Sequence, residues 1–180
     1  MRRATLLTMI VALVLTLSAG VAVAQTINGT NGPNTLRGTN AADTINGRGG
    51  ADEIYGRGGA DTLKGNDAAD RVYGMDGNDL ISGGFGNDPA LRGGAGDDEV
   101  EGNIGSDTVT GDTGDDTIRT VGDTSSDKVN CGEDTDGQDV DTAFVGSNDL
   151  VDGQQTSTIV TTTGLSCELL FVDGIQIPQI

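Results

Sequence analysis

Histidine and tryptophan are absent from the 180-residue chain. Without histidine, the chain lacks the general base of a Ser-His-Asp triad. The absence of histidine also excludes a zinc site of the H-E-x-x-H type. Two large classes of hydrolase are therefore excluded.

Basic residues are few, because 10 lysines and arginines stand against 28 aspartates and glutamates, giving a formal net charge of −18. Removing the first 24 residues, which carry two arginines and no acid, leaves a net charge of −20. Such a surface repels phosphates and anionic lipid headgroups. We therefore expect no nucleic-acid partner and no binding to anionic membranes.

Aromatic residues make up only 3% of the chain. An acidic chain with so few large apolar side chains buries too little surface to offset the entropy lost on ordering, and would ordinarily be disordered. The alternative is an ordering agent that cancels the negative charge. Outside a cell, the most available agent of this kind is a hard divalent cation.

Long apolar runs are absent apart from the one between Leu6 and Leu17. It follows Arg2-Arg3 and precedes Ala22-Val23-Ala24, which is the layout of a secretory signal with an A-x-A cleavage site. A membrane anchor is the competing interpretation, but the run is short and a cleavable end follows it. We predict a signal peptide over residues 1–24, no membrane insertion, and a secreted, extracellular protein.

Glycine is abundant, with 30 residues spaced mostly at intervals of nine. Aligned on glycine from Gly29, the chain divides into eleven nonapeptide units that end at residue 130. The seventh unit has one extra residue near Pro89, and the eleventh follows a two-residue insertion at Thr120-Val121. A period of this kind is typical of a stacked repeat fold.

Four columns of the repeat have distinct physical roles. The first position is glycine in all eleven units and the fourth is glycine in eight, as expected where the backbone adopts positive φ or passes close to an ion. The sixth position is aspartate in ten units and Asn34 in the first. The eighth position is a branched aliphatic residue in ten units, and we predict that these residues form the core: Leu36, Ile45, Ile54, Leu63, Val72, Ile81, Val100, Val109, Ile118 and Val129.

Polar residues flank each aliphatic residue, as in Thr44-Ile45-Asn46, which predicts a strand too short to stand alone but able to stack on a copy of itself. Two nonapeptides then form one coil. The pattern resembles the hemolysin-type (RTX) calcium-binding repeat, G-G-x-G-x-D-x-U-x with U a large aliphatic residue. The resemblance covers residues 29–130. It implies an all-β fold, a right-handed parallel β-roll (β-solenoid), with Ca²⁺ between the glycine turns of neighbouring coils.

The resemblance also implies the metal ligands. Carried over by position, they are the sixth-position aspartates: Asp43, Asp52, Asp61, Asp70, Asp79, Asp88, Asp98, Asp107, Asp116 and Asp127. Backbone carbonyl groups would complete the sites, at Gly47, Gly49, Gly56, Gly58, Gly74, Gly83, Gly86, Gly93, Gly102 and Gly111. The chain departs from the family pattern where Ala41, Ala68 and Ser125 replace the fourth glycine, and there we expect weaker binding. Asn34 is neutral, so the first unit is expected to be a cap.

Calcium suits these groups because it accepts six to eight oxygen ligands in flexible geometry. Coils about 4.8 Å apart would bring like carboxylates close together, so without a cation we expect the roll to be unfolded or loose. The alternative is that aspartate merely favours turns, as in calcium-free solenoids. Turn preference alone would scatter Asp, Asn, Ser and Gly over the loop, whereas here Asp occupies one column.

The period fails after Asn130, although the acidic, glycine-containing composition continues. We predict a repeat domain over residues 25–130 and an irregular, β-rich C-terminal cap over residues 131–180, which covers the open strand edges of the stack. Short strands are expected at residues 142–145, 157–163 and 168–172.

Cys131 and Cys167 are the only cysteines. An even pair in an exported chain is expected to form a disulfide, with two free thiols as the alternative.

Three classes of function remain. The leading one is a non-catalytic, secreted protein whose repeat domain folds on binding several Ca²⁺ ions. An enzyme is less favoured: members of the family that are enzymes carry a separate catalytic domain, and although a carboxylate-pair glycosidase needs no histidine, every acid here has a competing role in the turns. The third class is an adhesin, matrix or ice-binding module with the solenoid as scaffold. No aromatic stripe or basic patch in the sequence identifies a protein or polysaccharide partner.

Overall fold

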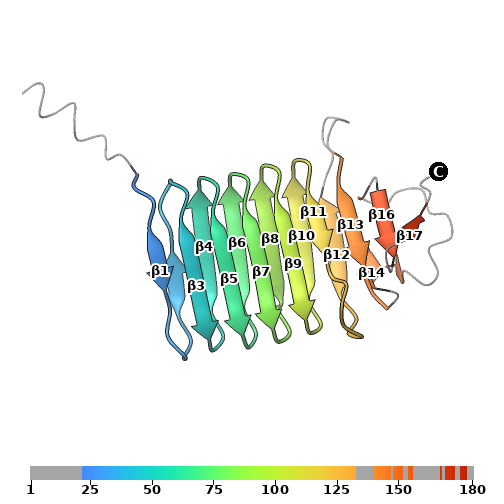
Figure 1. Cartoon of the computed structure of the whole chain (residues 1–180), viewed down its shortest axis with the longest axis horizontal. Helices are drawn as coiled ribbons and strands as arrows, with labels where there is room; N and C mark the ends of the chain where they lie inside the picture. The colour runs from blue at the N-terminus through green and yellow to red at the C-terminus, as the bar shows by residue number, and fades with distance from the viewer. Residues whose placement is uncertain are drawn as a thin grey trace, which may run out of the picture.

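The computed structural model describes residues 22–132, 140–146, 148–151, 154–155, 167, 169–172 and 175–177. Most of the predicted signal peptide, residues 1–21, lies outside the described residues, as does the strand predicted at residues 157–163. All regular elements of the described part are β-strands (Figure 1). No helix in this part of the chain is long and apolar enough to cross a membrane.

The strands form two sheets. Sheet A has nine strands in the order β1 (Thr26–Asn28), β3 (Thr44–Gly49), β5 (Thr62–Asp67), β7 (Leu80–Phe85), β9 (Glu99–Ile104), β11 (Thr117–Arg119), β13 (Thr142–Val145), β16 (Leu169–Val172) and β17 (Ile175–Ile177). Sheet B has eight, in the order β2 (Thr35–Arg37), β4 (Glu53–Gly58), β6 (Arg71–Asp76), β8 (Ala90–Ala95), β10 (Thr108–Thr113), β12 (Lys128–Gly132), β14 (Leu150–Val151) and β15 (Gln154–Gln155).

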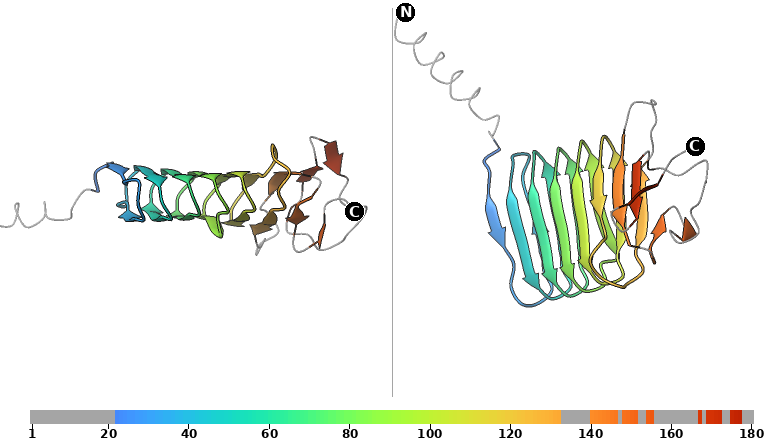
Figure 2. Two further views of the ribbon diagram at one scale, coloured as in Figure 1. Left: turned by 90° about the horizontal axis from the view of Figure 1, so that it is seen from below. Right: turned by 45° about the vertical axis from the view of Figure 1, so that its right-hand side comes forward.

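Successive strands alternate between the two sheets, so each coil contains two nonapeptides. Ile45 on β3 pairs in parallel with Leu63 on β5, and Leu63 pairs with Ile81 on β7, at a separation of 18 residues. Figure 2 shows the result as a narrow stack of coils in which the sheets face each other. The predicted parallel β-roll is therefore confirmed.

The core is a double row of eighth-position aliphatic side chains between the sheets. Exposure alternates along a typical strand such as β4. The eighth-position residue and the first-position glycine of the next unit point inward, and the ninth-position residue between them points outward. The predicted core residues from Ile45 to Ile118 have no exposed surface, and Val129 is 2% exposed. Leu36 is only partly buried because it lies in the first coil, beside Ile27, at the open end of the stack.

The two insertions leave the core register intact. Pro89 lies outside the strands, before Ala90, so that Leu91 pairs with Val72 and is fully buried. The shift of one residue had concealed Leu91 as the eighth-position residue of the seventh unit. At the second insertion, Thr120 is buried and its hydroxyl donates a hydrogen bond to Asp149 Oδ2 at 2.7 Å.

Parallel pairing continues past residue 130, where the nonapeptide period stops. β13 matches the strand predicted at residues 142–145 and pairs with β11, and β14 pairs with β12. β16 covers most of the strand predicted at residues 168–172 and pairs with β13. Each sheet then ends in one antiparallel strand, β15 or β17.

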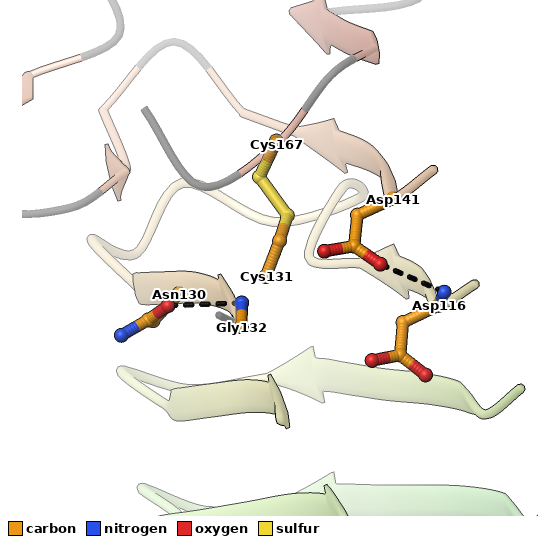
Figure 3. Close-up of a disulfide and its surroundings, with 6 residues drawn as sticks. All are labelled: Asp116, Asn130, Cys131, Gly132, Asp141 and Cys167. Atoms are coloured by element: carbon orange, nitrogen blue, oxygen red, sulfur yellow. Dashed lines mark hydrogen bonds between the residues drawn. A yellow bond between two sulfur atoms is a disulfide. The ribbon is translucent and has the colours of Figure 1, made fainter. Parts of the chain in front are cut away.

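A disulfide between Cys131 and Cys167 fastens this last part to the repeats, as predicted (Figure 3). Cys131 lies on β12 and is fully buried, Cys167 is 2% exposed, and their Cα atoms are 5.3 Å apart. The bridge closes a separation of 36 residues, which in the chain-entropy model stabilises the folded state by about 4 kcal/mol.

We expect replacement of both cysteines by serine to lower the midpoint of thermal unfolding in calcium, with the C-terminal strands lost before the repeats because coils contact only their neighbours. Hydrogen exchange would locate the loss. Wild-type protein treated with a reductant is the matched control and should behave like the variant. An unchanged midpoint in both samples would show that the bridge adds nothing to the stability.

Candidate metal centre

The sixth-position aspartates form two columns inside the solenoid, one beside each sheet. They lie just before strands and are 0–3% exposed. All ten aspartates predicted as ligands belong to these columns. In the first column the members are Asp43, Asp61, Asp79, Asp98 and Asp116, and in the second they are Asp52, Asp70, Asp88, Asp107 and Asp127.

A ladder of hydrogen bonds runs along each column. The backbone N–H of each aspartate donates to Oδ1 of the aspartate one coil further on, as from Asp61 to Asp79 at 2.7 Å. The ladder extends beyond the repeats, since Asp116 donates to Asp141 at 2.9 Å (Figure 3) and Asp127 to Asp149 at 3.1 Å. Each carboxylate is thus held in place by one of its oxygens.

The other carboxylate oxygen is left without a partner over most of both columns. In the described part of the chain, nine buried Oδ2 atoms have no hydrogen bond: those of Asp52, Asp61, Asp70, Asp79, Asp88, Asp98, Asp107, Asp116 and Asp127. Buried polar atoms in proteins are nearly always satisfied, and leaving a charged one unpaired is costly. Nine unpartnered Oδ2 atoms in two regular rows indicate that a binding partner belongs beside these oxygens.

The ends of the columns differ from the middle. Asp43 is the predicted ligand that does not fit the pattern, because its Oδ2 accepts hydrogen bonds from the Thr39 N–H at 2.5 Å and the Thr39 hydroxyl at 3.0 Å. Asn34 begins the second column as a neutral amide, and its N–H donates to Asp52. At the other end, Asp149 Oδ2 accepts hydrogen bonds from Thr120 and Gly146.

First-position glycines form the backbone beside these oxygens. A Cβ atom on Gly56 would overlap Asp61 Oδ2 and would lie 2.8 Å from the carbonyl oxygen of Gly74, one coil further on. The same arrangement recurs along both columns, so a carboxylate oxygen and a carbonyl oxygen face one glycine. Any larger residue would fill this oxygen-lined space, which explains glycine at the first position of the first ten units. Gly122 in the eleventh unit has nothing within 4 Å of its Cβ position, and its φ of 117° favours glycine instead.

Seven of the ten predicted carbonyl groups have this placement. They belong to Gly47, Gly56, Gly74, Gly83, Gly93, Gly102 and Gly111. Gly65 has the same placement and had been omitted from the prediction. Gly49 and Gly58 are third-position residues, and the carbonyl of Gly86 lies against Gly105 in a turn. A ligand role for those three stays a prediction.

The turns repeat one unusual backbone conformation. In eight consecutive units the second residue has positive φ, with Arg48, Arg57 and Met75 at 77–86° where Gly84 and Gly94 have 116° and 125°. The replacement of the second glycine therefore leaves the turn intact. Ala68 likewise keeps positive φ at the fourth position, at 84°. Ala41 and Ser125 do not adopt positive φ.

We expect Gly77→Ala to destabilise the roll by at least about 2 kcal/mol. Gly77 has a φ of 127°, and a Cβ there would overlap the carbonyl oxygen of Gly59 in the neighbouring coil. Gly32→Ala is the matched control, because Gly32 occupies the same repeat position without positive φ and has nothing within 4 Å of its Cβ position. Thermal unfolding in excess calcium measures both. Equal midpoints would contradict this account of the turns.

Burial changes the titration of the columns. It raises the pKa to about 7 for Asp70, Asp79, Asp98, Asp107 and Asp127, and to about 8 for Asp116. Nearby carboxylates add to the rise, as Asp88 and Asp52 do around Asp70, while the ladder hydrogen bond opposes it. Burial acts on Asp43 in the same sense, but hydrogen bonds from Thr39 and Gln25 outweigh it and lower the pKa. The middle of each column is thus the least favourable place for a carboxylate without a counter-ion.

The donor atoms are hard oxygens, and they are spread out. Among the described residues, no group of three or more His, Cys, Asp or Glu side chains gathers at one point. A cation here would therefore combine column carboxylates with backbone carbonyl groups. This combination fits calcium, which tolerates mixed oxygen ligands, better than magnesium, which demands a tight octahedron, or zinc, which prefers nitrogen and sulfur.

Two members of the columns were missed from the sequence. Asp141 and Asp149 hold the sixth position in the coils that follow the repeats, and both are buried. Each precedes a short strand with a buried residue at the equivalent of the eighth position, Ala143 or Val151. The signal was present as Asp-Thr-Ala and Asp-Leu-Val, but the glycines near it do not keep the register of the nine-residue repeat.

Comparison with known proteins agrees with the repeat and the fold. The family model of the RTX calcium-binding nonapeptide repeat, in four copies, matches residues 28–63, 55–88 and 90–118, which together make half of the chain. The break between the last two matches falls at Pro89, the extra residue of the seventh unit. No curated protein matches the chain. The chain therefore belongs to the RTX calcium-binding nonapeptide repeat family, whose repeats bind calcium.

Proposed function

We propose that the two aspartate columns bind a ladder of calcium ions, and that these ions order the solenoid of a secreted, non-catalytic protein. The observation that carries the proposal is the set of nine buried Oδ2 atoms without hydrogen-bond partners. A cation at these atoms supplies positive charge where burial and like charge most disfavour the ionised aspartates. Bound ions stabilise only the folded chain, because the coils bring the ligands together.

The ligand set follows from the ladder. The middle aspartates, from Asp52 to Asp127, would supply one carboxylate oxygen each, and first-position carbonyl groups would supply further oxygens. Asp43 and Asp149 satisfy both carboxylate oxygens within the protein. They act as the ends of the columns, together with the neutral Asn34. The proposed ions thus occupy the interior coils and not the terminal ones.

Secretion fits this chemistry. Calcium modules that act outside cells typically bind with dissociation constants of about 10⁻⁴–10⁻³ M, which keeps them unfolded in a cytosol poor in calcium. The signal layout of residues 1–24 supports the same route. A non-catalytic role is supported by the absence of histidine and by the structural roles of the column aspartates.

Asp79→Asn tests the ligand assignment. Asparagine keeps the size of the side chain and can accept the ladder hydrogen bond, but it removes the charge. We expect the variant to weaken the affected site by about tenfold, or about 1.4 kcal/mol, so that it binds at least one ion fewer than the wild type at calcium concentrations near the wild-type dissociation constant. Calorimetric titration of the chelator-treated mature chain gives both the stoichiometry and the affinity.

Asp67→Asn is the control, because Asp67 is an exposed third-position residue and the substitution changes the net charge equally. It should keep the wild-type stoichiometry. If the two variants bind calcium alike, the charge of the column is irrelevant and the ligand assignment fails.

A further inference from the structure

The outer face of sheet B carries a row of two arginines and two tyrosines. The ninth positions on β2, β4, β6 and β8 are in register with one another and are held by Arg37, Tyr55, Tyr73 and Arg92. The Arg37 guanidinium lies 4.9 Å from the centroid of the Tyr55 ring. The two tyrosine rings are stacked, with centroids 5.1 Å apart and planes 14° from parallel.

A hollow of about 400 Å³ borders this row. Its walls are Tyr55, Tyr73 and Met75, and the backbone around Gly94 on β8 lies along it. The hollow exists because β8 carries glycine at the second position, where β4 and β6 carry Arg57 and Met75. Tyr73 is stacked on Tyr55 on one side and borders this hollow.

A second hollow of about 570 Å³ lies further along the same sheet. Apart from one ion pair, the polar side chains that line it are uncharged, among them Thr108, Thr110 and Asn130. The two hollows share Arg92 and Asp112. These side chains form a two-point ion pair, with Nε to Oδ2 at 3.0 Å and Nη2 to Oδ1 at 2.5 Å.

The charges lining the hollows indicate what kind of ligand fits. The only charged residues of the second hollow are Arg92 and Asp112, which neutralise each other. The first adds Asp76, so carboxylates outnumber guanidinium groups there. An anionic ligand would meet repulsion, and a cationic one would compete with Arg92 for Asp112. An uncharged ligand meets neither obstacle.

An aromatic and thioether wall beside hydrogen-bonding groups suits a ligand that is apolar on one face and hydroxylated at its edges. A pyranose ring has this character. The Arg92 guanidinium uses two of its five N–H donors in the ion pair, and the Asp112 oxygens retain acceptor capacity. Both hollows are open to solvent, so a ligand there would keep one side exposed. Because the hollows follow one another along the sheet, they accommodate successive units of a chain.

We propose that the outer face of sheet B binds a neutral oligosaccharide, with one pyranose unit against Tyr73 and Met75 and the next beside Thr110 and Asn130, on either side of the Arg92–Asp112 pair. Calcium serves here only to hold the coils in register. The site thus goes beyond calcium binding, and the two are tested separately.

Affinity electrophoresis of the calcium-loaded mature chain tests the proposal, in gels that contain soluble neutral polysaccharides of several linkages or, in a parallel arm, polygalacturonate. We expect retardation by at least one neutral polymer and none by polygalacturonate. Tyr73→Ala should weaken that binding by about tenfold. The paired substitution Arg92→Gln with Asp112→Asn, which preserves shape, should also weaken it and carries the test if Tyr73→Ala fails to fold.

Phe144→Ala is the matched control, because Phe144 is an aromatic residue of sheet A whose ring lies 5.1 Å from the guanidinium of Arg119. It should leave retardation unchanged. Calcium stoichiometry measured on every variant separates failure of this site from failure of the calcium ladder. No retardation by any neutral polymer, retardation by polygalacturonate alone, or equal effects of Tyr73→Ala and Phe144→Ala would overturn the proposal.

Discussion

Removal of calcium from the mature chain is expected to abolish its β-structure. The nine unpartnered Oδ2 atoms lie inside the stack, and coils about 4.8 Å apart place like charges next to each other. At an effective dielectric constant of about 20, each such contact costs on the order of 3 kcal/mol. The opposing core is narrow, with one aliphatic side chain for each nonapeptide. Without the ions, the cost of charge repulsion and of lost chain entropy therefore exceeds the free energy gained by burying the aliphatic core.

Circular dichroism and hydrodynamic radius, measured in chelator and again after calcium is restored, check this expectation. We expect an expanded chain with little strand signal in chelator and full recovery with calcium. Each ion at ten times its dissociation constant contributes about 1.4 kcal/mol, so several ions together reach the stability of an ordinary domain. Magnesium at the same concentration is the control and should restore far less. A compact, strand-rich chain in chelator at a pH above about 8, where the column aspartates are ionised, would refute the role assigned to calcium.

Much of the solenoid was predictable because one rule repeats. A period of nine residues fixes which side chains point inward, and stacking then places Ile45 on Leu63 and Leu63 on Ile81. The aspartate columns follow from the same periodicity. The prediction failed where the period slips, at Leu91, Asp141 and Asp149, because the stack tolerates extra residues in turns while a sequence alignment loses register.

The sequence did not predict which carboxylate oxygens of the aspartates have hydrogen-bond partners within the protein. Asp43 and Asp52 hold the sixth position of adjacent units, yet Asp43 has partners for both oxygens and Asp52 for only one. The backbone of the second residue accounts for the difference. Thr39 has ordinary φ and its N–H reaches Asp43, whereas Arg48 has a φ of 77° and no hydrogen bond reaches Asp52 Oδ2. Residue type at the second position did not reveal this change.

The tyrosine row was missed for a different reason. Neighbours along one sheet are 18 residues apart, so Tyr55 and Tyr73 belong to alternate nonapeptides and never appear together in one. With only two tyrosines in the chain, composition indicated no aromatic surface. Folding brings both onto the outer face of sheet B. On sheet A, the register pairs Phe144 with Phe171, which are also far apart in the sequence.

Low pH is expected to stabilise the calcium-free fold, because protons on the column aspartates partly take over the role of calcium. Since burial raises the pKa of the middle aspartates to about 7 or 8, the folded chain binds protons more tightly than the unfolded chain, where the pKa of aspartate is about 3.9. This contribution to stability is complete below the unfolded value and is lost as pH rises through about 7–8. Each aspartate that titrates in this range changes the free energy of unfolding by about 1.4 kcal/mol per pH unit.

Thermal unfolding of the calcium-free chain between about pH 4 and pH 9 measures the effect. We expect a cooperative transition at the acidic end that weakens and disappears toward the alkaline end. In excess calcium the dependence should reverse, because the ion binds the ionised carboxylates and affinity therefore rises with pH. Asp67→Asn should leave the direction of both dependences unchanged, since Asp67 is exposed and adds only a like charge near Asp70. A calcium-free chain that gains stability as pH rises would show that the column aspartates are not the groups that oppose folding.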